Sequence, residues 1–137
     1  MATNFPPGPG RILGIGGVFF KSSDADQARS WYADKLGIDS GKYGASFHWR
    51  SFENPEQEHQ TAWSIFKSSS DYFAPGTAPF MINYIVDDLD AFLAKVAAAG
   101  VRIDPKRDDA DYGRFAWIFD VDGNKIELWE PQPPPKG

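Results

Sequence analysis

The sequence predicts an α+β fold in which two βαβββ modules form a partly closed, barrel-like cup. Three observations lead to this prediction. Segments typical of strands and helices follow the same order in both halves of the chain, short motifs recur at a nearly constant spacing, and the chain closes with a strong hairpin pattern. The 137 residues suffice for one ordinary domain with its own core.

The internal repeat sets the predicted organisation. Asp88-Leu89-Asp90 follows Asp24-Ala25-Asp26 by 64 residues, and "NKIELWE" follows "TAWSIFK" by 63. We therefore expect one domain over 1–137, with module one at about 11–67, a connector at 68–79, module two at about 80–131 and a Pro-rich tail at 132–137. Two such modules placed side by side enclose a concave face, which is the natural place for a ligand. The connector is either a lid over that face or only a link between the modules.

Module one is expected to begin with a strand, "ILGIGGVFF" at 12–20. A helix should follow over about 25–36, because Ser22-Ser23-Asp24 offers N-cap residues and Gly37 offers a stop. Its spacing predicts that Trp31 and Tyr32 face the core. "KYGASFHWRSF" and "QTAWSIFKS" are typical of strands separated by a polar loop, and Trp63 is expected in the core.

Module two is expected to begin with the strand "FMINYIV" at 80–86, followed by a helix that Asp87-Asp88 caps and Gly100 ends. A short strand and a solvated loop holding Asp108-Asp109 should come next. The hairpin then joins a strand from Arg114 to Phe119 to a strand from Lys125 to Glu130, through a turn rich in Asp, Gly and Asn. The Pro-rich end, "PQPPPKG", should not join the sheet.

Glu127 raises the main question about function, because it lies in the middle of the last strand. Alternation places Lys125, Glu127 and Trp129 on one face of that strand, and Ile126 and Leu128 on the other. We expect Glu127 to face the cup. It is then either a structural residue, paired with an arginine such as Arg114, or a desolvated carboxylate that serves as a base. The sequence leaves both possibilities open.

Composition excludes several kinds of protein. The net charge of −5 and a pI near 4.9 make nucleic acid and anionic membranes poor partners. The absence of Cys rules out disulfides and thiolate sites. No apolar run approaches the ~20 residues of a membrane span. We expect a cytoplasmic protein. The aromatic content of 15% suits a site that grips a flat ligand.

Several motifs, taken in order, resemble the vicinal oxygen chelate superfamily, which includes glyoxalases, bleomycin-resistance proteins and extradiol dioxygenases. They are the "WY" and "LGI" of the first helix, "VDDLDAFLAKVAAAGV", and above all the closing "FDVDGNKIELWEP". The resemblance covers residues 12–131. It implies the paired-module fold of that superfamily, and it implies pairing of two chains into a symmetric homodimer.

The resemblance also implies four metal-ligand positions, which in this chain fall on Gly17, Ser64, Met81 and Glu127. Only Glu127 is a residue type that binds hard divalent ions well. We therefore expect no metal and no cofactor. His48 and His59 are the only imidazoles, and both lie away from these positions. Whether His48 takes part in a site stays open.

The expected function is that of a metal-free protein that binds a small molecule of unassigned identity. The alternative is a lyase- or dioxygenase-type enzyme that acts on a small vicinal-oxygen substrate. The ligand is expected to be planar, aromatic or amphipathic, and cationic in view of the net charge. Glu127 is the candidate catalytic residue. The predicted ligand-binding residues are Ser64, Met81, Asn83, Trp117, Glu127 and Trp129. The sequence does not decide whether the cup forms within one chain or across a dimer.

Overall fold

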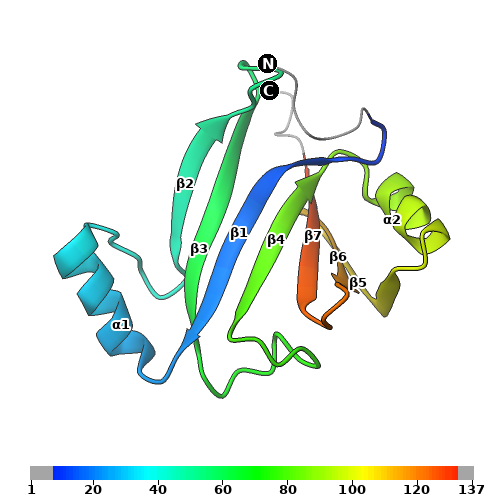
Figure 1. The fold of residues 1–137 in the computed structure, drawn as a ribbon. Helices are drawn as coiled ribbons and strands as arrows, with labels where there is room; N and C mark the ends of the chain where they lie inside the picture. Colours follow the sequence, from blue (N-terminus) through cyan, green and yellow to red (C-terminus); the bar gives the residue numbers. More distant parts are fainter. Residues whose placement is uncertain (1–7, 133–137) are drawn as a thin grey trace.

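The computed structural model describes residues 8–132 and contains one mixed sheet of seven strands in the order β2-β3-β1-β4-β7-β6-β5. Figure 1 shows that the sheet curves strongly and carries a helix near each end. Its strands are β1 (Ile12–Ser22), β2 (Ala45–Arg50), β3 (Glu58–Lys67), β4 (Phe80–Val86), β5 (Arg102–Ala110), β6 (Gly113–Phe119) and β7 (Lys125–Pro131). The sheet does not close into a barrel, as expected for the predicted α+β cup.

The two modules meet at β1 and β4, which pair antiparallel. Within each module the first and last strands pair parallel, β1 with β3 and β4 with β7. The register brings Gly17, Asn83 and Glu127 into one row across β1, β4 and β7. The concave face around Glu127 is therefore built by both modules of a single chain.

Both helices begin at the predicted Asp caps. Asp24 accepts a hydrogen bond from the backbone N–H of Gln27 at 3.0 Å before α1 (Ala25–Trp31), and Asp88 accepts one from Ala91 at 3.0 Å before α2 (Leu89–Ala98). The first helix continues as a π-helical turn, η1 (Tyr32–Leu36), which ends at Gly37 with φ of 75°. In the described part of the chain, neither helix is long and apolar enough to cross a membrane.

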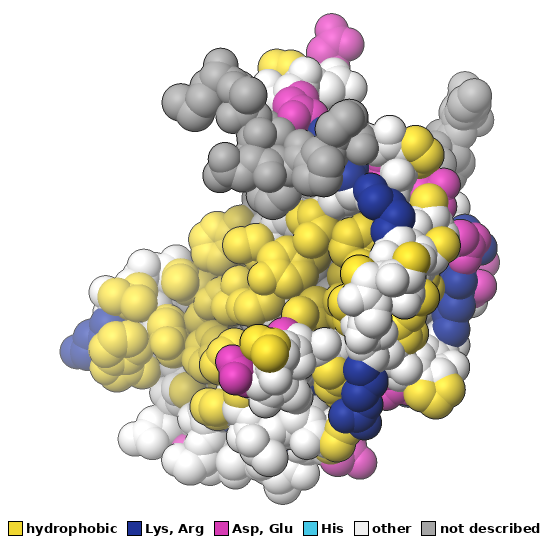
Figure 2. Space-filling view, turned by 45° about the vertical axis from the view of Figure 1, so that its right-hand side comes forward, with side chains coloured by type: hydrophobic (Ala, Val, Ile, Leu, Met, Phe, Trp, Pro, Cys, Tyr) yellow, Lys and Arg dark blue, Asp and Glu magenta, His cyan; other side chains and the backbone are white. Residues whose placement is uncertain are grey.

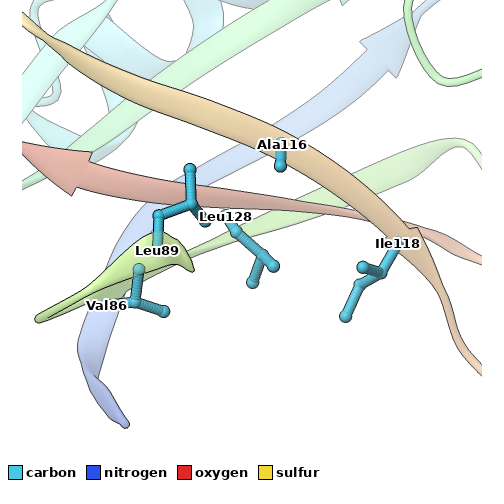
Figure 3. Close-up of a cluster of buried hydrophobic side chains, with 5 residues drawn as sticks. All are labelled: Val86, Leu89, Ala116, Ile118 and Leu128. Atoms are coloured by element: carbon cyan, nitrogen blue, oxygen red, sulfur yellow. The ribbon is translucent and has the colours of Figure 1, made fainter. Parts of the chain in front are cut away.

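The helices cover the outer face of the sheet, each over one apolar cluster. Figure 3 shows the cluster beneath α2, where side chains of β4, β6 and β7 lie on the same side of the sheet as Leu89. The cluster beneath α1 is centred on Ala25, Trp63 and Ile65, so the core position predicted for Trp63 is confirmed. Burial of these side chains, at roughly 1.5–3 kcal/mol each, fixes the helices on the sheet.

Module one departs from the prediction in two ways. It has two strands after its helix rather than three, since residues 40–44 contribute only an isolated bridge between Gly41 and Gly44. The prediction for Trp31 is wrong, because its side chain is 50% exposed. The change from α- to π-helical geometry after Trp31 alters the angular spacing, and Tyr32 packs on Trp63 instead, with ring centroids 4.9 Å apart.

Three strands extend into segments predicted as loop or tail. β3 already begins at Glu58, and β5 continues through Asp108 and Asp109, which pair with Phe115 and Arg114 of β6. β5 is an edge strand, so its charged side chains stay in water. Pro131 ends β7 opposite Gly113. Proline is tolerated at a strand terminus because no hydrogen bond of the sheet requires an N–H group there. The rest of the tail, at 133–137, lies outside the described residues.

Candidate functional site

Glu127 lies at the centre of the concave face and is 3% exposed. Its two carboxylate oxygens accept hydrogen bonds from three neutral side chains. Asn83 Nδ2 donates to Oε1 at 2.7 Å, Trp117 Nε1 donates to Oε2 at 3.0 Å, and the Tyr72 hydroxyl also donates to Oε2. Burial of a carboxylate is costly unless such donors replace water. Three neutral donors thus satisfy Glu127 in place of the arginine partner that the sequence suggested for a structural role.

The sheet register positions two of the three donors. Asn83 is the direct partner of Glu127 in the parallel pair of β4 and β7, and Trp117 is its partner in the antiparallel pair of β6 and β7. Side chains of directly paired residues point to the same face, so both reach the carboxylate. Tyr72 comes from the connector, far from Glu127 in sequence.

The phenol of Tyr72 is held in its donor form. Burial raises the pKa of Tyr72 well above its ordinary value, and the negative charge of Glu127 raises it further. Ionisation would put two negative charges against each other in a partly buried place. Tyr72 therefore remains protonated at neutral pH and donates to the carboxylate.

The connector covers the part of the cup beside Glu127 with two aromatic side chains. Phe73 is 1% exposed and packs with Met81 and Trp117 in the third apolar cluster. The ring of Tyr72 stacks on Phe66 at 5.6 Å with an interplanar angle of 20°, and meets Trp117 edge-on at 6.5 Å. Of the two roles considered for the connector, the structure matches a cover over the cup.

Two glycines of β1 make room at the same centre. A Cβ at Gly16 would lie 2.3 Å from Asn83 Oδ1, and a Cβ at Gly17 would lie 3.1 Å from Asn83 Cβ. Only glycine allows the backbone of β1 to lie this close to Asn83. Asn83 Oδ1 is buried and has no hydrogen-bond partner within the described residues, so one acceptor of the site is unused.

Lysines surround the aromatic side chains of the site. Lys125 Nζ lies 5.5 Å from the ring centroid of Tyr72 and 5.6 Å from that of Trp117, and it donates to the Tyr72 carbonyl at 2.9 Å. Lys106 Nζ lies 5.3 Å from the Trp117 ring, and Lys21 Nζ lies 5.3 Å from the Phe73 ring. The local charge is therefore mostly positive, although the whole chain is acidic.

The structure gathers Asn83, Trp117 and Glu127 of the predicted ligand-binding residues into direct contact. Met81 points to the same face but is completely buried under Phe73. Ser64 lies two strands away from β4, and its hydroxyl donates to the Tyr43 carbonyl at 3.3 Å.

Trp129 lies further along the concave face, where its ring stacks on Phe115 at 6.0 Å. It lines an open groove of about 250 Å³ together with His48, Gln60 and Tyr112. His48 therefore lines this groove and does not lie beside Glu127. The pairing suggested between Glu127 and Arg114 is wrong, because Arg114 lies on the opposite face of β6 and pairs with Asp90, Asp109 and Glu130.

Sequence reasoning placed Lys125 on the face of Glu127 but missed Tyr72, Phe73, Lys21 and Lys106. Strand alternation identifies residues within the sheet but says nothing about a connector that folds back over it. One signal was present: "DYF" places two adjacent aromatic residues in a segment otherwise rich in turn formers. Large apolar rings in a polar loop indicate that the loop buries them somewhere.

Comparison with known proteins gives the family. Residues 14–128 match the model of the Glyoxalase/Bleomycin resistance protein/Dioxygenase superfamily, and the chain belongs to that family. A comparison with curated proteins gave no match.

Solved structures show the same fold at low identity. Methylmalonyl-CoA epimerase from Mycobacterium tuberculosis is 20% identical, with a TM-score of 0.59 over 89% of this chain and 90% of that one. A variant of the Streptomyces coelicolor epimerase in complex with 2-nitronate-propionyl-CoA is 16% identical, with a TM-score of 0.63 over 89% and 99%. A Legionella pneumophila structure described as an NAD-dependent benzaldehyde dehydrogenase is 13% identical, with a TM-score of 0.55 over 85% and 98%.

The residues at this site do not fit the divalent metal that the family implies. Within residues 8–132 there is no group of three or more His, Cys, Asp or Glu side chains that could hold a metal ion. Gly17 has no side chain, Met81 is fully buried, and the oxygens of Glu127 already accept three hydrogen bonds. A hard ion would find one carboxylate where it needs several oxygen or imidazole ligands.

Proposed function

We propose that this protein binds a small aromatic molecule on the concave face beside Glu127, without a metal ion. The observation that carries the proposal is the buried Glu127 with its aromatic surroundings, Phe66, Tyr72 and Trp117. A binding site of this kind combines apolar walls with one or two fixed polar groups that orient the ligand. Glu127 supplies a strong acceptor, and the rings supply the walls.

The alternative, a lyase- or dioxygenase-type enzyme, has less support from the side chains. Such chemistry in this family depends on an ion open to the substrate, and the donor set for that ion is lacking in the described residues. Glu127 alone would have to act as the base, while its oxygens are engaged by three donors. The binding function requires only that one donor gives way to a ligand.

The decisive experiment is a ligand screen by native mass spectrometry with the wild type and with Glu127→Gln. The substitution keeps the shape and removes the charge, so it tests the electrostatic role of the side chain. We expect a ligand whose affinity falls at least several-fold in the variant, because hydrogen bonds to a charged acceptor are about twice as strong as neutral ones. Equal binding of every ligand to both proteins would refute a site at Glu127.

A second measurement on the same sample tests the absence of metal. We expect less than a tenth of an equivalent of zinc, nickel, iron or manganese after expression in metal-supplemented medium. About one tightly held ion per chain, with turnover of a vicinal-oxygen substrate, would favour the enzyme instead.

A further inference from the structure

The connector occupies the site with a phenol of its own. The Tyr72 ring stacks on Phe66 and lies nearly perpendicular to the Trp117 ring, and its hydroxyl donates to Glu127. Each feature that a receptor for a phenol needs is present: a stacking surface, an edge contact and a charged acceptor at the end of the ring. The Tyr72 side chain thus indicates the shape and polarity of a ligand that this site would accept.

Few hydrogen bonds hold this occupant in place, and its apolar anchors are the rings of Tyr72 and Phe73. Between its two ends, the described connector forms three hydrogen bonds with the sheet. They run from Tyr72 to Glu127, from Lys125 Nζ to the Tyr72 carbonyl at 2.9 Å, and from Ser70 N–H to the Lys67 carbonyl at the end of β3. Its end residues bond to β1, through Ser68 N–H to the Ser22 carbonyl and Lys21 N–H to the Pro79 carbonyl. With so few hydrogen bonds between its anchored ends, the segment opens more readily than the paired strands of the sheet.

Charged groups next to the ring favour a negative substituent on a ligand. Lys125 lies within 5.5 Å of the Tyr72 ring centroid, and Lys106 and Lys21 lie beside the neighbouring Trp117 and Phe73 rings. The acidic groups that act on Tyr72 are Glu127, whose oxygens are already bonded, and Asp108 of β5. Three ammonium groups outnumber these acidic groups next to the rings, so the cationic ligand suggested by the net charge is the less favourable choice.

Building on the proposed function, we infer that the ligand is a phenol with an anionic side chain, and that it enters by displacing Tyr72 from Glu127. The ligand's hydroxyl replaces that of Tyr72 on the carboxylate, and its ring takes the place between Phe66 and Trp117. The anionic group reaches Lys125 or Lys106. The connector is then a competitor built into the chain, and it lowers the apparent affinity of the wild type for the ligand.

Three small probes test this inference by calorimetric titration. They are 4-hydroxyphenylacetate, phenylacetate, which lacks the hydroxyl, and tyramine, which carries a positive charge instead. The proteins are the wild type, Tyr72→Ala and the control Tyr43→Ala, whose side chain is 89% exposed. We expect 4-hydroxyphenylacetate to bind Tyr72→Ala at least tenfold more tightly than it binds the wild type or Tyr43→Ala. Phenylacetate and tyramine should each bind Tyr72→Ala at least fivefold more weakly than 4-hydroxyphenylacetate does.

Tyr72→Phe provides the same test if Tyr72→Ala does not fold, because it keeps the ring and removes only the hydroxyl. The gain in affinity should then be smaller but in the same direction. Equal binding of 4-hydroxyphenylacetate to the wild type and to the Tyr72 variants, or equal binding of all three probes, would overturn the inference. If screened ligands still lose affinity in Glu127→Gln, only this inference fails. If none does, the proposed function fails as well.

Discussion

Removal of the Tyr72 hydroxyl should destabilise the protein measurably, because that hydroxyl satisfies a buried carboxylate. Tyr72→Phe keeps the stacking on Phe66 and the edge contact with Trp117, so the apolar packing is preserved. What is lost is one of three hydrogen bonds to Glu127. Hydrogen bonds to charged groups contribute about 1.5–3 kcal/mol.

The loss should therefore lower the free energy of unfolding by about 2 kcal/mol. For a domain of this size, 1 kcal/mol corresponds to roughly 3–5 °C in Tm, so we expect a decrease of roughly 6–10 °C. Urea unfolding followed by tryptophan fluorescence gives the free energy, and calorimetry gives Tm.

Tyr43→Phe is the matched control, because Tyr43 is 89% exposed. It should change stability by less than about 0.5 kcal/mol. If Tyr72→Phe matches this control, the phenol does not contribute to the burial of Glu127, and our reasoning about the connector is wrong.

Four further predictions follow from other parts of the structure. Gly16→Ala should destabilise the protein by roughly 1–3 kcal/mol in urea unfolding, because the new Cβ would lie 2.3 Å from Asn83 Oδ1. The control Gly41→Ala should be close to neutral, because its new Cβ would have no atom within 4 Å. Leu128→Ala should cost about 2–5 kcal/mol by the same measurement, because Leu128 is completely buried beneath α2. Burial lowers the pKa of His59 below its ordinary value of about 6.5, so unfolding takes up a proton at acidic pH. The free energy of unfolding should therefore fall as the pH drops below about 6.5. If His59→Gln leaves the dependence of Tm on pH unchanged, this reasoning is contradicted. Sedimentation should show a symmetric homodimer, because the outer face exposes Phe47 (48%) and Phe80 (45%). Figure 2 also shows a broad area of hydrophobic side chains. A single species of ~15 kDa at micromolar concentration would contradict the homodimer.

Strand alternation and capping signals predicted most of the sheet and both helix starts. These signals are local, and the buried face of each strand repeats every second residue. The hairpin of β6 and β7 illustrates this, because Lys125, Glu127 and Trp129 share one face as expected. The side of Asn83 could be predicted for the same reason, although its direct pairing with Glu127 needed the observed register.

The failures occur where distant parts of the chain meet. Tyr72 contacts Glu127 only because the connector folds back over the sheet, and no periodicity marks such a contact. Trp31 was misjudged because the helix changes geometry after it. The positive charge beside Trp117 and Phe73 comes from lysines on three different strands, and the net charge of the chain does not reveal such a local grouping.

A crystal structure of the protein with its screened ligand, prepared in the presence of a chelator, would decide whether a metal-free ligand site lies beside Glu127. We predict ligand density beside Glu127, with a ring between Phe66 and Trp117. Tyr72 and its neighbours in the connector should have moved away from Glu127, and anomalous scattering should show no metal signal. Ligand density confined to the groove of His48 and Tyr112 with Tyr72 still on Glu127, or a metal ion bound to Glu127, would contradict the account.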